Sequence, residues 1–244
     1  MCVTLQKTKR KTKVMTFKKI FILILFFFSF SNISYGQEFD YNRDFKEILK
    51  ENQNKSSKLY FKTLLDRFEK NDSTLTNYEV IALQIGFTDN EYYKPYENLD
   101  KEREILKLIK DKEYEKAIQI SDDFLKSNPL NLTALMEKGF AFMKLKKDNT
   151  EFHKEKTKKI LRSIFWSGDG TIEKPYFVLS PIDSQTLIKY IMGGTIGKMG
   201  SGRDKNKNFV DILEMIKDEK SITKYFIIEH ASKKLMEKLE KELK

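Results

Sequence analysis

The most regular stretch of the sequence is YEKAIQISDDFLKSNPLNLTALMEKGFAFM, residues 114–143. Its apolar residues recur three and four positions apart in two blocks, the spacing of the buried face of an amphipathic helix. Asn128-Pro129 separates the blocks, and proline ends a helix because it lacks an amide proton. The stretch therefore predicts two consecutive helices. The residues on their predicted faces are Tyr114, Ala117, Ile118, Ser121, Phe124, Leu125, Leu132, Leu135, Met136, Gly139, Phe140 and Met143.

The same spacing predicts helices on both sides of this pair. They lie around residues 45–49, 60–68, 78–85, 105–109 and 151–166. Thr76 or Asn77 is suited to cap the third of these, since side-chain oxygens accept hydrogen bonds from the free amides of a helix start. Pro95 biases Lys94 away from helical geometry, so residues 92–96 are expected to form a loop.

The composition changes after Ser167, because seven of the ten glycines lie between Gly168 and Gly202. We expect a strand at 176–179, a helix capped by Asp183, a flexible loop at 193–202 and a charged helix from 232 to the end. Residues 222–228 are β-rich, whereas 209–216 fit a helix and a strand equally well. A polar turn at 218–220 would join the two segments as a hairpin.

Residues 100–145 resemble a tetratricopeptide repeat. The positions that match its second helix, its closing proline and the start of the next unit are Ala117, Ser121, Phe124, Pro129, Gly139 and Phe142. Gly139 stands where that repeat keeps a glycine because two helices cross closely. The resemblance covers about one and a half repeats, and about three are needed for stability, so it implies that flanking helices complete the stack.

Residues 40–230 as a whole resemble the family called domain of unknown function 4919. The matching features are the helix start at Leu75-Thr76, the Tyr93-x-Pro95-Tyr96 element, the repeat-like helical pair, and Ser167-Gly168-Asp169-Gly170-Thr171 leading into Tyr176-Phe177-Val178. The resemblance implies strands at 208–216 and 222–229. It also implies an exported protein, and it assigns no activity.

The first 36 residues have the composition of a secretory signal peptide. Seven lysines and arginines and no acid occupy residues 1–19, an apolar run follows over 20–30, and small polar residues lead to Gly36. Eleven residues span only about half of a ~30 Å hydrocarbon layer, so a stable membrane span is disfavoured. We therefore expect cleavage near Gly36 and release into the periplasm or the medium, with Met1 or Met15 as the true start.

Most of the excess positive charge belongs to this leader. The chain carries 46 basic and 36 acidic residues, a net charge of +10, and without residues 1–36 the balance is 39 to 36. So small an excess gives no basis for predicting nucleic-acid binding. The only cysteine, Cys2, also lies in the leader, so the mature chain is expected to lack a thiol nucleophile, a disulfide and a thiolate metal ligand.

Two clusters are candidate binding sites. Tyr93, Pro95 and Tyr96 gather in the predicted loop, and aromatic residues beside a proline can form a ligand or partner patch. The alternative is a loop that folds onto the helices and buries its rings. Asp169 lies in an SGDG motif, where glycine allows close backbone approach to an ion. The alternative there is a helix stop, with Gly168 in the left-handed conformation and Asp169 closing a turn, since no further acids follow at calcium-loop spacing.

Other motifs give no convincing chemistry. Residues 193–199, GGTIGKM, are one residue short of a phosphate loop, and Met199 replaces the hydroxyl that would hold magnesium. His153 and His230 are single, not paired at zinc spacing, so each is expected at the surface or at its boundary. The chain has no Gly-x-Ser-x-Gly nucleophile motif. We therefore predict no catalytic residue, no cofactor and no metal.

These observations predict an α+β protein with a signal peptide over 1–36, a tetratricopeptide-like helical array over 37–166, and a small C-terminal α+β unit with antiparallel strands over 167–244. Stacked helical pairs leave a concave surface and need no reactive groups, which favours a non-catalytic protein-interaction or scaffold module of the cell envelope, its protein partner unknown. Two alternatives stay open. One is an exported hydrolase that uses a carboxylate, with Asp169 as the candidate, and the other is a small-ligand-binding protein that uses the tyrosine cluster.

Overall fold

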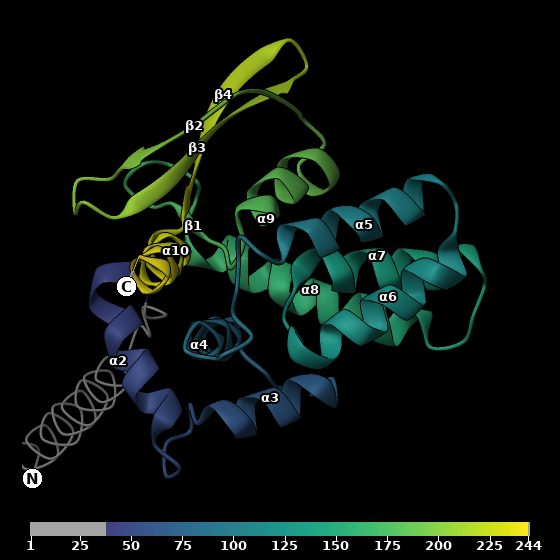
Figure 1. The fold of residues 1–244 in the computed structure, drawn as a ribbon, viewed down its shortest axis with the longest axis horizontal. Coiled ribbons are helices and arrows are strands. Elements are labelled where there is room, and N and C mark those ends of the chain that lie inside the picture. Colours follow the sequence, from purple (N-terminus) through teal and green to yellow (C-terminus); the bar gives the residue numbers. More distant parts are fainter. Residues whose placement is uncertain (1–37, 244) are drawn as a thin grey trace, which may run out of the picture. The chain divides into compact units, whose positions relative to one another are not determined.

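The computed structural model describes residues 38–243, and the part from Phe39 onward forms one compact unit (Figure 1). Its α+β class is the one predicted, with helices first and a mixed sheet near the C-terminus. The helices are α2 (Tyr41–Gln53), α3 (Phe61–Glu69), α4 (Asn77–Phe87), α5 (Leu99–Lys110), α6 (Tyr114–Ser127), α7 (Leu132–Lys144), α8 (Thr150–Ser167), α9 (Pro181–Thr186) with the π-helical η1 (Leu187–Ile191), and α10 (Glu229–Glu242). The strands are β1 (Tyr176–Phe177), β2 (Thr195–Arg203), β3 (Phe209–Lys217) and β4 (Lys220–Ile227). The predicted signal peptide, residues 1–36, lies outside the described residues.

Helix α4 is the centre of the helical part. Residues 80–87 are all buried, and α4 packs against α2, α3 and α8. A helix that is apolar on every side must be enclosed on every side, which explains this position. Thr76 caps it, because its Oγ1 accepts the Glu79 amide at 3.2 Å while its own amide donates to Glu79 Oε2 at 2.8 Å. The structure thus selects Thr76 over Asn77 as the cap.

The closest glycine contact between helices is at Gly86, not at Gly139. A Cβ on Gly86 would lie 1.9 Å from Asn52 Oδ1 of α2, whereas a Cβ on Gly139 would lie 3.7 Å from the nearest atoms of α8, an ordinary contact. The close crossing that the repeat resemblance implies at Gly139 is therefore wrong. Helices α5 to α8 do pack on their neighbours in sequence, but the tetratricopeptide-like reading is not confirmed.

The four strands are ordered β1-β4-β3-β2. β3 and β4 form the predicted antiparallel hairpin, with Lys217 opposite Lys220 and a two-residue turn in which Asp218 and Glu219 have positive φ. β1 is only two residues long and pairs in parallel with β4, Tyr176 opposite Phe226.

The flexible loop predicted at 193–202 is wrong, because residues 195–203 form strand β2 paired with β3. Most of β2 is exposed, it contains three glycines, and only Thr195 and Ile196 are β-branched, so it lacks the alternating pattern and the β-branched content of a typical strand. Its identity as a strand comes from hydrogen bonding to β3, which is a non-local interaction.

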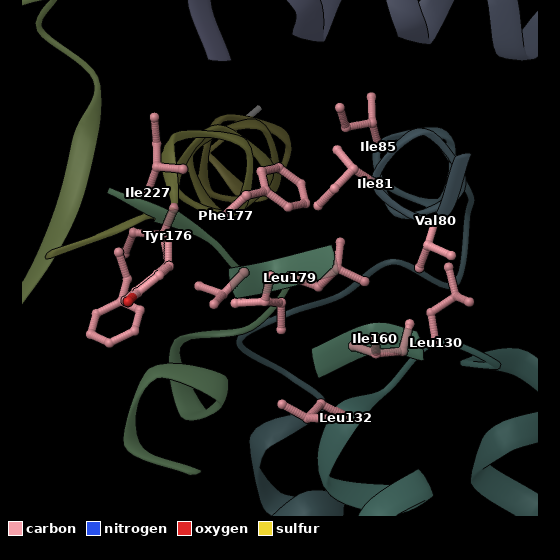
Figure 2. Close-up of a cluster of buried hydrophobic side chains, with 14 of the residues drawn as sticks. Val80, Ile81, Ile85, Leu130, Leu132, Ile160, Tyr176, Phe177, Leu179 and Ile227 are labelled. Atoms are coloured by element: carbon pink, nitrogen blue, oxygen red, sulfur yellow. The ribbon is translucent and has the colours of Figure 1, made fainter. Parts of the chain in front are cut away.

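One hydrophobic core joins the helical part to the sheet (Figure 2). Phe177 of β1 is fully buried, and such a ring contributes roughly 1.5–3 kcal/mol by leaving water. The core includes both predicted regions, 37–166 and 167–244, and the boundary between them stays a prediction. Side chains labelled in Figure 2 are Val80, Ile81, Ile85, Leu130, Leu132, Ile160, Tyr176, Phe177, Leu179 and Ile227.

Among the helices of residues 38–243, none combines the length and apolar composition needed to cross a bilayer.

Candidate functional site

The predicted tyrosine cluster lies in the loop between α4 and α5. We call residues 91–97 the tyrosine loop. Tyr93 is buried, and its hydroxyl donates to the Leu179 carbonyl oxygen at 2.7 Å. Its ring meets Phe87 edge-on at 5.9 Å, and burial raises the pKa of its phenol well above the ordinary value. Tyr93 therefore anchors the loop to the C-terminal part of the chain instead of presenting a free ring.

Pro95 and Tyr96 line a groove between the tyrosine loop and α10. The groove has a volume of about 670 Å³, and Leu235 of α10 faces the same space. Lys238 Nζ lies 3.0 Å from Glu97 Oε1, so an ion pair links the two walls. The remaining charged side chains around the groove are Glu91, Lys94, Lys234, Glu237, Lys241 and Glu242. The groove thus combines apolar contacts with a rim of both charges.

Asp169 belongs to a different feature, the turn that follows α8. Its Oδ1 accepts the Thr171 amide at 2.8 Å, and this hydrogen bond holds the pKa of the carboxyl below its ordinary value. Gly168 has φ of −174°, an extended conformation, so the left-handed residue predicted there is wrong. Gly168 is needed for space, because a Cβ would lie 2.5 Å from the Lys174 carbonyl oxygen. The left-handed glycine is Gly170, with φ of +77°.

A pair of buried acids lies behind the tyrosine loop. Glu102 of α5 is fully buried, and its Oε1 accepts the Asn131 side-chain amide at 2.7 Å. Asp183 of α9 is 3% exposed, and its Oδ2 accepts the Ser180 backbone amide at 2.9 Å. Ser180 is the N-cap of α9, so the cap predicted at Asp183 is wrong by three residues. Among the described residues, Glu102 Oε2 and Asp183 Oδ1 have no hydrogen-bond partner.

Burial makes these two acids easier to protonate. Desolvation, and then repulsion from Asp183, raises the pKa of Glu102 well above its ordinary value. Desolvation also raises the pKa of Asp183 to about 7. Both side chains line a cavity of about 20 Å³, which is room for one water molecule. The pair can hold a proton near neutral pH, but the cavity does not hold a substrate.

The sequence gives little signal for this pair. Glu102 lies in a helix with several other charged residues, where an acid is ordinarily solvated, and Asp183 reads as a capping residue. The one hint is their neighbours, since Glu102 follows the loop of Tyr93 and Pro95 closely in sequence. Both of those residues line the small cavity as well.

His230 is a core residue, 5% exposed, so the position predicted for it at the surface or its boundary is wrong. Its Nε2 donates to the Val178 carbonyl oxygen at 2.8 Å, and its ring stacks on Phe177 with centroids 4.7 Å apart. Burial lowers its pKa to about 4, so the ring is neutral at pH 7. His153 is half-buried against Phe142, as a boundary residue should be.

The glycine-rich segment at 193–199 belongs largely to β2 and does not form a phosphate loop. The Lys198 backbone amide donates to Glu214 Oε2 at 2.9 Å. This amide is therefore already hydrogen-bonded to a carboxylate, whereas a phosphate loop needs it as a donor to the phosphate. Within residues 38–243, no three His, Cys, Asp or Glu side chains are grouped as metal ligands.

A family model described as domain of unknown function (DUF4919) matches residues 46–237, which is most of the chain. Neither the curated proteins nor the solved structures include a match.

Proposed function

Because the chain belongs to the DUF4919 family, whose description names no activity, we propose a function from the groove between the tyrosine loop and α10. The protein is a non-catalytic interaction module of the cell envelope that holds a segment of a partner protein in this groove. The leader-like composition of residues 1–36 supports export to the periplasm or the medium.

The observation that carries the proposal is the placement of three of the four predicted binding residues in one concave surface. Pro95 and Tyr96 offer apolar contact on one wall and Leu235 offers it on the other. Interfaces commonly have an apolar centre inside a polar rim, and tyrosine is enriched at their energetic centres. Because lysines and glutamates alternate on the rim, the fitting partner is a segment with an apolar anchor side chain and flanking charges of both signs.

The same groove supports a second function, binding of a small molecule. Its volume of about 670 Å³ lies within the usual range of roughly 300–1,000 Å³ for ligand pockets. We rank this below a protein partner because the rim is formed by long, flexible charged side chains, which are less suited to enclosing a small ligand.

Photocrosslinking tests the proposal with the full chain expressed in its source cells. A benzoylphenylalanine replaces Lys234, which lines the groove, or Met236, which is 54% exposed on the same helix outside it. We expect a discrete protein adduct from position 234 and not from 236. Adding Leu235→Glu should abolish the adduct, whereas Leu239→Glu, one turn further along α10, should retain it.

Equal labelling at both positions, or an adduct that survives Leu235→Glu, would contradict the protein-binding proposal. A small molecule that co-purifies with the wild-type chain in native mass spectrometry and is lost in Leu235→Glu would favour the second function. Export has its own test, since mass spectrometry of the cellular protein should find an N-terminus near residue 37 and not Met1 or Met15.

A further inference from the structure

The tyrosine loop forms a wall shared by the groove and the small acid-lined cavity. Tyr93 and Pro95 line both spaces. Leu235 and other residues of α10 complete the lining of the groove, and Glu102 and Asp183 belong to the lining of the cavity. A change in the cavity therefore acts directly on a wall of the groove.

Asp183 is also connected to the loop through the backbone. Its Oδ2 accepts the Ser180 amide, and the preceding residue, Leu179, accepts the Tyr93 hydroxyl on its carbonyl oxygen. The position of α9 thus fixes the acceptor that anchors the loop. Asp183 is the N3 residue that closes the capping box of α9. Its charge state therefore acts on the start of α9 and on the neighbouring Leu179 carbonyl that anchors the tyrosine loop.

We propose that the Glu102–Asp183 pair is a proton-controlled support for the groove. While the pair holds a proton, the tyrosine loop stays anchored and the groove is formed, and when both acids ionise the loop loosens and the groove loses one wall. This inference rests on the proposed binding function of the groove.

The physical reason is charge repulsion in a place with little solvent. Two carboxylates in a cavity that holds one water repel each other strongly, whereas one proton turns an unpaired oxygen into a hydrogen-bond donor. That donor can satisfy the other unpaired oxygen, directly or through a water. Loosening of the loop separates α5 from α9 and admits water, which relieves the repulsion.

The surrounding groups do not supply a compensating buried charge. Arg103, next to Glu102 on α5, is exposed, and α7 contributes the neutral amide of Asn131. The loop contributes the phenol of Tyr93, which burial keeps protonated. On the sheet side of α9, Asp211 of β3 is a third acid, whose pKa is raised by burial and whose Oδ1 accepts the Ser201 hydroxyl at 3.2 Å. Asp211 is therefore a suitable control.

Hydrogen exchange tests this inference on the full chain. Protection of the peptide covering residues 91–98 is measured at pH 6, 7 and 8 and corrected for the intrinsic exchange rate. An opening that releases one proton becomes about tenfold more favourable per pH unit up to the folded pKa. We expect the protection of this peptide to fall steadily from pH 6 to pH 8, by up to about tenfold per pH unit. The peptide over α6 should not change.

The variants identify the group that titrates. Asp183→Asn should remove the pH dependence and keep the loop protected at pH 8, while Asp211→Asn should leave the dependence as in the wild type. If Asp183→Asn does not fold, Glu102→Gln, which preserves the acceptor for Asn131, serves the same purpose. Unchanged protection of the wild-type loop between pH 6 and pH 8 would overturn the inference, and so would a pH dependence that persists in the folded variant.

A cation is the competing occupant of the cavity. If millimolar calcium or magnesium chloride restores loop protection at pH 8 in the wild type but has no effect on Asp183→Asn, the pair binds a cation and the inference is overturned. The crosslinking yield at position 234 separates this inference from the proposed function. A pH-dependent loop with no adduct at any pH refutes the binding function alone, whereas an adduct with equal yield at pH 6 and pH 8, together with unchanged loop protection, refutes the proton control alone.

Discussion

Asp183→Asn should make the protein more stable above neutral pH, although it removes a charged, hydrogen-bonded side chain. Asparagine can still accept the Ser180 amide, which lies 2.9 Å from Asp183 Oδ2, so the cap of α9 remains. What disappears is the ionisation of a fully buried acid. The pKa of this acid is raised from an ordinary 3.8 to about 7 by desolvation.

The sign and size of the effect follow from proton linkage. A raised folded pKa means that the folded state binds a proton more tightly, so this contribution to stability is complete below pH 4 and is lost as the pH rises through 7. A shift of about three pKa units at 1.36 kcal/mol each gives about 4 kcal/mol as the upper limit. Glu102 stays buried beside position 183 and keeps its own desolvation cost. We therefore expect Asp183→Asn to stabilise the protein by about 2–4 kcal/mol at pH 8 and by close to zero at pH 4.

The assay is urea unfolding of wild type and variant at several pH values. The difference between the two proteins is the informative quantity, because His230 changes the stability of both. Burial lowers the pKa of His230 to about 4, so its contribution is present above pH 6.5 and is lost as the pH falls through 4. Asp169→Asn is a control, since a lowered pKa at this exposed site predicts a small change of opposite sign. A difference that is flat with pH, or a variant less stable at pH 8, would refute this reasoning.

Four further substitutions test the helix crossing at α4, the anchor of the tyrosine loop and the β3–β4 turn. Gly86→Ala should destabilise the protein by about 2 kcal/mol in chemical unfolding, because the added methyl group overpacks against Asn52. The control Gly139→Ala should be neutral or slightly stabilising. Equal effects of the two substitutions would contradict the close crossing at α4. Tyr93→Phe should cost about 1–2 kcal/mol because it leaves the buried Leu179 carbonyl unpaired, and an unchanged unfolding midpoint would contradict the anchoring role. Glu219→Gly should raise the melting temperature by an amount equivalent to about 0.5–1 kcal/mol, since φ is +60° there, and a lower melting temperature would contradict the two-residue turn.

The candidate site was only half predictable. Tyr93, Pro95 and Tyr96 stand together in the sequence with the chemistry of a contact surface, and they do lie at the groove. The opposite wall, with Leu235 and Lys238, comes from the last helix, and no local pattern relates it to the tyrosine loop.

The acid pair was hidden for a different reason. An acid in a charged helix or at a helix start is ordinarily exposed, so Glu102 and Asp183 look unremarkable. Their burial depends on α5, α7 and α9 meeting around one small cavity. Asp169 shows the reverse case, since its motif predicts a site or a turn, and the structure places it in a turn.

The sequence by itself determined the helices, because apolar spacing, capping residues and proline act over a few positions. Its local pattern left residues 209–216 open between helix and strand, and the β3–β4 pairing was expected from the family resemblance. The sequence did not determine β2, whose exposed and glycine-rich residues become a strand only when β3 supplies hydrogen bonds. It also did not determine which helices approach most closely, the burial of His230, or the groove. Those features depend on contacts between residues far apart in the chain, and only the tertiary structure decides which of these contacts form.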